Sequence, residues 1–382
     1  IPNTPSTQCK VRVRQRWASG GEPGQRQFSL AEHTSDVYSV AWSPDGSKLI
    51  TVSDDNTAII WDPSFGTKLV TLTGHGGPIR AAVWSPDGTK IVTAGDDRTA
   101  IVWNAVTGVK LLTLSGHTNT IWDVSWSPDG KSIATASKDM TAIAWNATTG
   151  SKLFTMGSHS KDVIMARWSP DGSKIATAGF DTKAFVWEVA TGVQLTALVD
   201  HTGELTTISW SPDGSMIATA GRDATLVIWD TASALIKLKF FGQRDVIKSV
   251  NWSPDGTKIA AGGYDKQVIV YDITTGQQLL TLIGHSDYVH SVTWSPDGTK
   301  IASTGFDNTT IIWDAVTGER LYTLVGQTSW VYEAVWSPDG TRVATASKDH
   351  TAALWFVDNI PVQIDTSDAV FTIVVPKVSS QN

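Results

Sequence analysis

The sequence predicts an all-β fold made of eight copies of one four-stranded unit. The pentapeptide Trp-Ser-Pro-Asp-Gly occurs eight times, and its copies start 42 residues apart without insertion or deletion. A fixed period of this length indicates a repeat architecture in which each unit packs on the next. The copies begin at Trp42, Trp84, Trp126, Trp168, Trp210, Trp252, Trp294 and Trp336. We expect the array, residues 25–358, to form one domain.

The first unit shows the four expected strands. Val37 to Trp42 is rich in β-branched and aromatic residues, and the Ser-Pro-Asp-Gly that follows breaks it. In that turn Pro presets φ and Gly supplies a positive φ. Lys48 to Ser53, Thr57 to Trp61 and Thr67 to Leu72 are three further strands, each bounded by turn residues. Four short strands per unit are typical of a β-propeller blade.

The two ends of the array predict how the ring closes. The last unit stops after its third strand, residues 351–356, and a lone strand, residues 25–30, precedes the first unit. Pairing of these two segments would complete an eighth blade and remove two exposed strand edges. The sequence therefore predicts an eight-bladed β-propeller that is closed by its own ends.

Short motifs recur in register with the period. Gly-His stands near the start of a unit and Trp-Asp near its end, as in Gly74-His75 and Trp61-Asp62. With these motifs the array resembles the WD-repeat β-propeller family. The resemblance implies one buried hydrogen-bonded tetrad of His, Ser or Thr, Asp and Trp in each unit. In the second and third units the tetrads fall on His75, Thr93, Asp97 and Trp103, and on His117, Thr135, Asp139 and Trp145.

Two units depart from this tetrad. The sixth has Gln243, Ala261 and Tyr271 around Asp265, and the eighth has Gln327 in place of the histidine. A buried polar group without a partner costs about 1–3 kcal/mol. We expect backbone donors to satisfy Asp265, and we expect the sixth blade to be the least stable of the ring.

Composition and motifs exclude several classes of function. The net charge of −7 argues against a nucleic-acid partner, and without a run of about 18 apolar residues no membrane insertion is expected. The single cysteine, Cys9, rules out an intrachain disulfide framework and a thiolate metal cluster. The repeated histidines have one structural role per unit. We therefore expect no catalytic residue, no metal site, no cofactor and no enzymatic activity.

The flanks, residues 1–17 and 359–382, also contain strand-like runs, and residues 18–24 have the composition of a linker. The flanks resemble strands of an immunoglobulin-like module of the kind found in large secreted bacterial surface proteins. This resemblance implies a propeller inserted into a partial immunoglobulin-like sandwich, on an extracellular or cell-surface protein. The alternative is that both flanks are disordered tails. Because the chain begins with Ile1, we expect it to be part of a longer polypeptide.

Function is sought at positions where the eight copies differ. Three such positions per unit are expected on one rim of the ring, which the resemblance makes the usual ligand face. Exposed aromatic side chains carry much of the binding energy of interfaces, and they gather in the late units. The predicted ligand-binding residues are Tyr38, Arg80, Trp122, Phe180, Arg222, Tyr264, Tyr288, His290, Phe306, Trp330 and Tyr332.

From this rim we predict a non-enzymatic recognition and scaffolding module that binds a protein or peptide. Three alternatives stay open: a glycan-binding adhesin module, a structural spacer or assembly unit of a surface fibre, and an intracellular regulatory propeller. A glycan is possible because aromatic rings beside Asp and Arg also suit sugars. Self-association without a soluble partner would favour the spacer.

Overall fold

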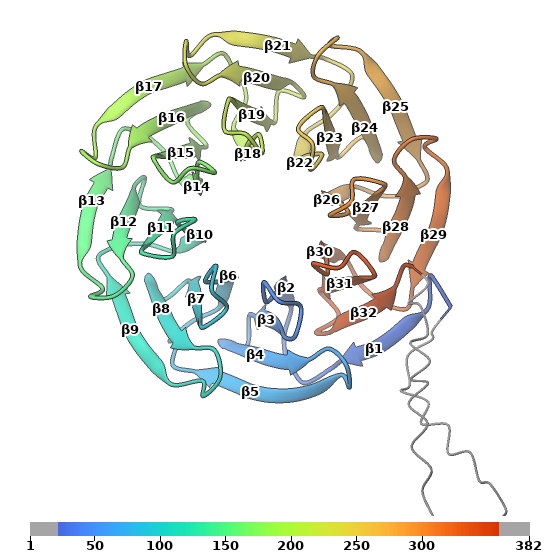
Figure 1. Ribbon diagram of the computed structural model, residues 1–382, viewed down its shortest axis with the longest axis horizontal. Helices are drawn as coiled ribbons and strands as arrows, with labels where there is room; N and C mark the ends of the chain where they lie inside the picture. Colours follow the sequence, from blue (N-terminus) through green and yellow to red (C-terminus); the bar gives the residue numbers. More distant parts are fainter. Residues whose placement is uncertain (1–21, 359–382) are drawn as a thin grey trace, which may run out of the picture.

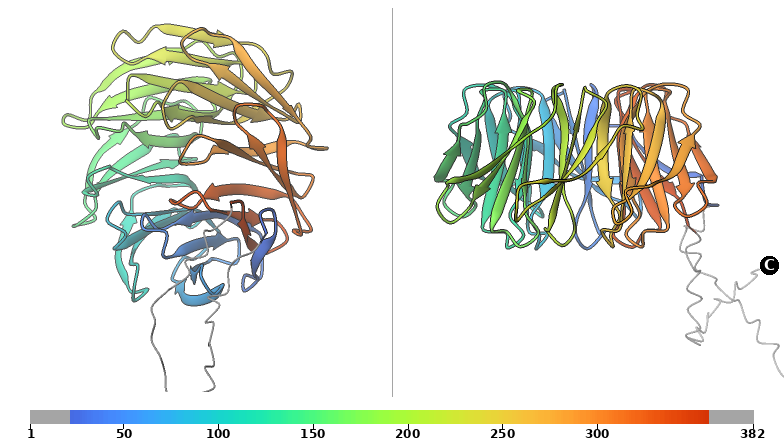
Figure 2. Two further views of the ribbon diagram at one scale, coloured as in Figure 1. Left: turned by 45° about the vertical axis from the view of Figure 1, so that its right-hand side comes forward. Right: turned by 90° about the horizontal axis from the view of Figure 1, so that it is seen from above.

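The computed structural model describes residues 22–358, which fold into a ring of eight four-stranded antiparallel sheets (Figure 1). Each sheet is one blade, with its first strand nearest the ring axis and its fourth strand on the outer edge. Seen from the side the ring is a flat disc with loops on both faces (Figure 2). None of the described residues belongs to an apolar helix of membrane-spanning length.

The strands follow the predicted order. Blades 1 to 4 are β2 Val37–Trp42, β3 Leu49–Ser53, β4 Thr57–Asp62 and β5 Thr67–Thr73; β6 Ile79–Trp84, β7 Lys90–Gly95, β8 Thr99–Asn104 and β9 Lys110–Ser115; β10 Ile121–Trp126, β11 Ser132–Ser137, β12 Ala142–Asn146 and β13 Lys152–Met156; β14 Val163–Trp168, β15 Lys174–Gly179, β16 Lys183–Glu188 and β17 Gln194–Val199.

Blades 5 to 8 repeat the pattern, and the last takes its outer strand from the other end of the chain. They are β18 Leu205–Trp210, β19 Met216–Gly221, β20 Leu226–Asp230 and β21 Ile236–Phe240; β22 Ile247–Trp252, β23 Lys258–Gly263, β24 Gln267–Asp272 and β25 Gln278–Ile283; β26 Val289–Trp294, β27 Lys300–Gly305, β28 Thr309–Asp314 and β29 Arg320–Val325; β30 Val331–Trp336, β31 Arg342–Ser347, β32 Ala352–Phe356 and β1 Arg26–Leu30.

The turns divide between the two faces of the disc. In an antiparallel sheet successive turns lie at opposite ends of the strands. The Ser-Pro-Asp-Gly turns therefore share one face, here called the bottom face. The loops before each innermost strand and the turns between second and third strands share the other, here called the top face. In the bottom turns Gly46 has a φ of +69°, and Ser43 Oγ donates to Asp45 Oδ1 at 2.6 Å.

The core lies between blades rather than at the ring axis. Val92 and Val102 of blade 2, for example, pack against Val124 and Trp126 of blade 3 in one buried cluster. The Trp126 indole also donates to the Val83 carbonyl of blade 2 at 3.2 Å. The same Trp-to-carbonyl bond joins other neighbouring blades, as from Trp84 to Ala41 at 3.0 Å. Each blade thus needs both of its neighbours to bury its faces.

Ring closure occurs as the sequence predicts. β1 pairs antiparallel with β32, and Phe28 and Ser29 lie opposite Leu354 and Ala353 (Figure 1). Leu30 is 1% exposed and belongs to a cluster shared by blades 8 and 1.

The boundary of the ring lies slightly earlier than predicted. Gly24 N donates to the Phe356 carbonyl at 2.7 Å, so the end of the predicted linker is tied to the last strand. The remaining linker residues 18–21 and the two immunoglobulin-like flanks, 1–17 and 359–382, lie outside the described residues. The inserted-module hypothesis therefore stays a prediction.

Leu30→Ala tests the closing strand. We expect it to lower the free energy of unfolding by about 2–5 kcal/mol, because it removes a fully buried side chain. Leu114→Ala, at the equivalent position of β9, is the matched comparison, since that residue is also fully buried. Ser29→Ala on the exposed side of β1 is the neutral control. Urea unfolding in which Leu30→Ala behaves like Ser29→Ala would contradict closure.

Candidate recognition face

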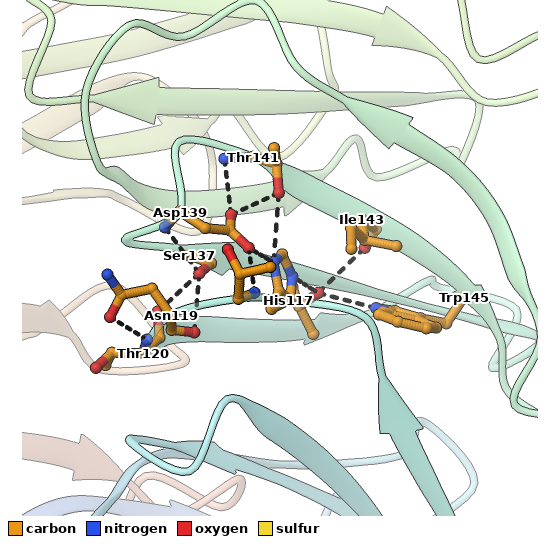
Figure 3. Close-up of polar contacts among 10 residues, drawn as sticks. His117, Asn119, Thr120, Ser137, Asp139, Thr141, Ile143 and Trp145 are labelled. Carbon is orange, nitrogen blue, oxygen red and sulfur yellow. Dashed lines mark hydrogen bonds and ion pairs between the residues drawn. The ribbon is translucent and has the colours of Figure 1, made fainter.

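The buried tetrads position the top-face loops. In blade 3 the Trp145 indole donates to Thr135 Oγ1 at 2.9 Å, and Thr135 Oγ1 lies 2.7 Å from His117 Nε2 (Figure 3). His117 Nδ1 is 2.8 Å from Asp139 Oδ2. Because an indole only donates, a neutral imidazole completes a one-way relay from Trp to Thr to His to Asp.

The aspartate at the end of this relay fixes the backbone of the loop. Asp139 also accepts from Thr118 N at 2.8 Å and from Thr141 N at 3.0 Å (Figure 3). The bonds from His117, from the Thr141 hydroxyl and from Thr118 N hold the pKa of Asp139 well below its usual range despite partial burial. The tetrad of His75, Thr93, Asp97 and Trp103 has the same contacts in blade 2. The ring nitrogens of the tetrad histidines are thus bonded within the scaffold, as the sequence indicates.

The sixth blade satisfies its aspartate from the backbone, as expected. Asp265 accepts from Arg244 N at 3.1 Å and from Gln267 N at 3.2 Å. Gln243 donates to the Ala261 carbonyl at 2.8 Å, but its Oε1 is buried without a partner. The Tyr271 hydroxyl is buried beside Gly242 without a well-formed hydrogen bond, and burial raises the pKa of Tyr271 to about 12. The relay is therefore missing in this blade.

On the top face, aromatic side chains of blades 6 to 8 stack in a continuous row. Tyr264 and Tyr288 stack with ring centroids 4.3 Å apart, and Phe306 and Trp330 stack at 4.2 Å with nearly parallel planes. Tyr288 and Phe306 join the two pairs at 6.2 Å. Lys348 Nζ lies 4.0 Å from the centroid of the Trp330 ring. These four rings come from turns and loops, and we call them the outer row.

A second row of rings lies on the innermost strands. His290 on β26 stacks on Phe306 at 5.4 Å and meets Tyr332 on β30 at 5.5 Å. Tyr332 in turn stacks on Tyr38 of β2 at 5.0 Å, across the seam where the ring closes. We call His290, Tyr332 and Tyr38 the inner row, and the two rows together the aromatic ladder. The ladder therefore spans blades 6, 7, 8 and 1.

The inner row ends in a charged cluster on blades 1 and 2. Arg80 lies 4.7 Å from the Tyr38 ring centroid and donates to Asp96 at 2.8 Å and to Asp54 at 3.0 Å. The Tyr332 hydroxyl donates to Asp36 Oδ2 at 3.2 Å. Burial raises the pKa of Asp54, and the nearby charges of Asp36 and Asp96 add to the rise. This side of the top face carries Asp36, Asp54 and Asp96, and the Arg80 guanidinium among them is already paired.

The structure revises the exposure expected of the rim. Trp330 and Tyr288 are 38% and 37% exposed and remain accessible, whereas Tyr332 is only 9% exposed. Burial and the nearby Lys248 charge lower the pKa of His290 to about 3, and its Nδ1 donates to the Tyr332 carbonyl at 2.6 Å. Both residues support the outer row through their contacts with Phe306 rather than standing exposed beside it.

Three predicted rim residues lie apart from the ladder. Trp122 on β10 and Phe180 after β15 make no ring contact with it, and the Trp122 indole nitrogen is buried without a hydrogen-bond partner. Arg222 after β19 is mostly exposed and pairs with Glu204 at 3.2 Å. The sequence spacing placed all three correctly at the top of their blades, but blades 3 to 5 supply no second ring for stacking.

Comparison with known proteins agrees with this geometry. Eight segments of the chain match the WD domain, G-beta repeat, at residues 24–62, 66–104, 108–146, 150–188, 192–230, 236–272, 276–314 and 318–355. The chain belongs to the WD40 repeat family. WD40 propellers are scaffolds for protein interaction, and that is the general kind of function to which the chain belongs.

A shorter similarity connects the WD40 chain to a curated protein. It is 46% identical over 41 residues to a subunit of chromatin assembly factor 1 from Mus musculus. The match covers 11% of this chain and 7% of that protein, a length close to one repeat. It supports the repeat assignment and covers little else of either chain.

Sequence reasoning missed the charged groups that line the axis of the WD40 ring. Asp123 on β10 accepts from Ala166 N at 3.1 Å and pairs with Arg167 of the next blade. Glu333 on β30 accepts from Val40 N at 3.1 Å, and burial raises the pKa of its carboxyl. A comparison of the eight copies at this position would have shown that the other blades carry Ser, Ala, Thr or Met there. These residues tie neighbouring innermost strands together.

The bottom face has a hollow of about 420 Å³ under blades 3 to 6. Its lining is mostly the repeated Trp, Ser and Pro residues, together with Arg167 and Asn251. Their indole nitrogens are already bonded, as for Trp168 to the Ser125 carbonyl at 3.3 Å. Among residues 22–358, no cluster of His, Cys, Asp or Glu could hold a metal ion. The top face therefore remains the better candidate.

The incomplete tetrad of blade 6 can be rebuilt. The triple variant Gln243→His, Ala261→Thr and Tyr271→Trp should raise the free energy of unfolding by about 1–3 kcal/mol, because it replaces two side chains that have buried unpartnered groups by ones that bond to each other and to Asp265. Urea unfolding measures the gain, and the single change Tyr271→Trp is the control that adds the indole without its acceptor. A triple variant no more stable than this control would contradict the idea that blade 6 lacks a relay.

Proposed function

We propose that this WD40 propeller is a non-enzymatic recognition and scaffolding module that binds a protein or peptide across the aromatic ladder. One observation carries the proposal: seven rings from four consecutive blades touch one another on the top face, and Tyr288 and Trp330 stay partly exposed. A few partly exposed aromatic side chains of this kind dominate the binding energy of protein interfaces.

The rest of the scaffold offers less to a partner. The tetrads, the turn aspartates and the Trp residues of the repeat have their hydrogen bonds within the chain. At the position of Tyr288 and Trp330 the other blades carry Asp36, Pro78, Thr120, Asp162, Glu204 and Val246. The ladder is thus a local concentration of apolar contact area on an otherwise polar face.

The stacking favours a peptide over the glycan alternative. Sugars bind to the open faces of aromatic rings, but in the outer row each ring has one face stacked on a neighbouring ring. Tyr264 and Tyr288 cover each other, and Phe306 covers one face of Trp330. Stacking leaves less open ring face for a sugar, whereas the partly exposed Tyr288 and Trp330 still suit side-chain packing in a protein or peptide interface. We therefore keep a glycan as the second ligand class.

The cellular setting is a further part of the proposal. The resemblance of the flanks supports a secreted or cell-surface protein, and no nucleic-acid partner is proposed for a chain of net charge −7. The intracellular alternative draws on the one-repeat similarity to part of a mouse chromatin assembly factor. The structural-spacer alternative predicts self-association, which sedimentation of the full chain at rising concentration would reveal.

A double substitution tests binding through the ladder. Random twelve-residue peptides displayed on phage are selected against the wild-type chain, and the affinity of the recovered peptides is measured by calorimetry. Trp330→Ala with Tyr288→Ala should weaken binding at least about tenfold, since each ring is a hot-spot candidate. The melting temperature should fall by no more than about 4 °C, because both side chains are partly exposed.

The matched control is Thr120→Ala with Asp162→Ala, which changes the same repeat position in blades 3 and 4. This pair should leave affinity unchanged. Recovered peptides that bind the ladder variant as tightly as the wild type would place recognition on another surface.

A further inference from the structure

Blade 2 shows how this fold holds a cation at the top of an innermost strand. Arg80 occupies that place on β6, and two carboxylates flank it, one from each neighbouring turn. Asp96 belongs to the same blade and accepts at 2.8 Å, whereas Asp54 belongs to blade 1 and accepts at 3.0 Å. The charge of Arg80 is thus neutralised within the chain.

Blade 6 has a cation at the same repeat position without these partners. Lys248 on β22 corresponds to Arg80, but Arg222 stands where blade 1 has Asp54, and Tyr264 stands where blade 2 has Asp96. No hydrogen bond or ion pair holds the Lys248 ammonium within residues 22–358. Glu204, which precedes β18 on blade 5, already pairs with Arg222 at 3.2 Å and with Lys161 at 3.4 Å.

The other neighbours of Lys248 do not compensate its charge. Thr206 on β18 donates its hydroxyl to the Ile247 carbonyl. His290 on β26 donates Nδ1–H to the Tyr332 carbonyl, and with its lowered pKa it stays neutral. Burial lowers the pKa of the Lys248 ammonium, and the positive charge of Arg222 lowers it further.

A partly buried ammonium without a counter-charge costs free energy that an incoming anion would recover. The site also lies beside the aromatic ladder, because Tyr264 occupies the turn of the same blade and stacks on Tyr288. A ligand that reaches Lys248 therefore also touches the outer row.

We propose that Lys248 receives the carboxylate of an Asp or Glu side chain of the bound peptide, which takes the place of the two carboxylates that blade 2 supplies internally. This inference rests on the proposed function and adds a specificity to it. The bound peptide would place an acidic residue at Lys248 and a neighbouring apolar residue on the ladder. Arg222 stands at the edge of the site as a second cation.

A single carboxylate fits this surface better than a polyanion does. Among the cations at the top of blades 5 and 6, Arg222 already pairs with Glu204 and Lys266 donates to the Ser286 carbonyl at 2.8 Å. Asp36, Asp54 and Asp96 lie on blades 1 and 2 of the same face, and Arg80 is the one cation that bonds to Asp54 and Asp96. The three carboxylates would repel a nucleic acid or a heavily sulfated glycan. The same acidic cluster would attract a basic residue at the far end of an acidic peptide.

The test uses the same displayed twelve-residue peptides and the full chain. Peptides selected on the wild type should be enriched in Asp or Glu next to an aromatic or aliphatic residue. For the tightest synthetic peptide, replacing that acid by Asn or Gln should weaken binding about tenfold or more, as for other charge-assisted hydrogen bonds. On Lys248→Met the same replacement should change affinity less than about twofold, because the paired group is gone.

Two further variants sharpen the result. Lys152→Met removes the same charge from an exposed position on outer strand β13 and should behave like the wild type. Arg222→Asp gives Lys248 a carboxylate at the repeat position from which Asp54 of blade 1 bonds to Arg80. It should neutralise Lys248 internally and abolish the preference for acidic peptides, as Lys248→Met does.

The outcomes separate this inference from the proposed function. Peptides without acidic enrichment that still lose affinity on the ladder variant would overturn the role of Lys248 and keep the ladder. Acidic enrichment that persists on Lys248→Met and on Arg222→Asp would likewise overturn it. Peptides that are insensitive to the ladder variant would overturn the proposed function itself.

Discussion

The antiparallel pairing of β1 with β32 is the constraint on which the rest of the structure depends. Each blade buries its faces against its neighbours, so an open array would leave blades 1 and 8 half uncovered. The closing strand also removes two free edges that would invite association with other chains. In addition it places β30 beside β2, which allows Tyr332 to stack on Tyr38 across the seam. The contact that extends the ladder to blade 1 therefore exists only in the closed ring.

The ring separates scaffold from specificity. Tetrads and Ser-Pro-Asp-Gly turns repeat because each fixes one local backbone geometry. Their polar groups form hydrogen bonds within the chain. The top-face positions between them are free to differ. In blade 2 they hold an internally neutralised guanidinium, whereas in blade 6 a comparable cation lacks its carboxylates. One architecture thus yields an acidic sector, an aromatic sector and a cationic sector on the same disc.

Much of this could be predicted from the sequence because the period is constant. Strand bounds followed from turn residues, and β3 begins one residue later than expected, at Leu49. Closure followed from a lone strand at one end and a missing one at the other. The period could not show that Tyr332 is buried or that His290 packs under Phe306, since equal spacing carries no information on side-chain stacking. Glu333 was missed for another reason: its repeat position was not compared, although only Asp123 and Glu333 are acidic there.

Hydrogen exchange of the backbone amides of β1 tests closure most directly. If β1 is paired with β32, the paired amides of residues 26–30 exchange as slowly as those of β9, the equivalent outer strand of blade 2. Amides of β1 that exchange at the rate of an unstructured chain, while β9 stays protected, would show an open array. The seam and the Tyr332–Tyr38 contact across it would then be contradicted together.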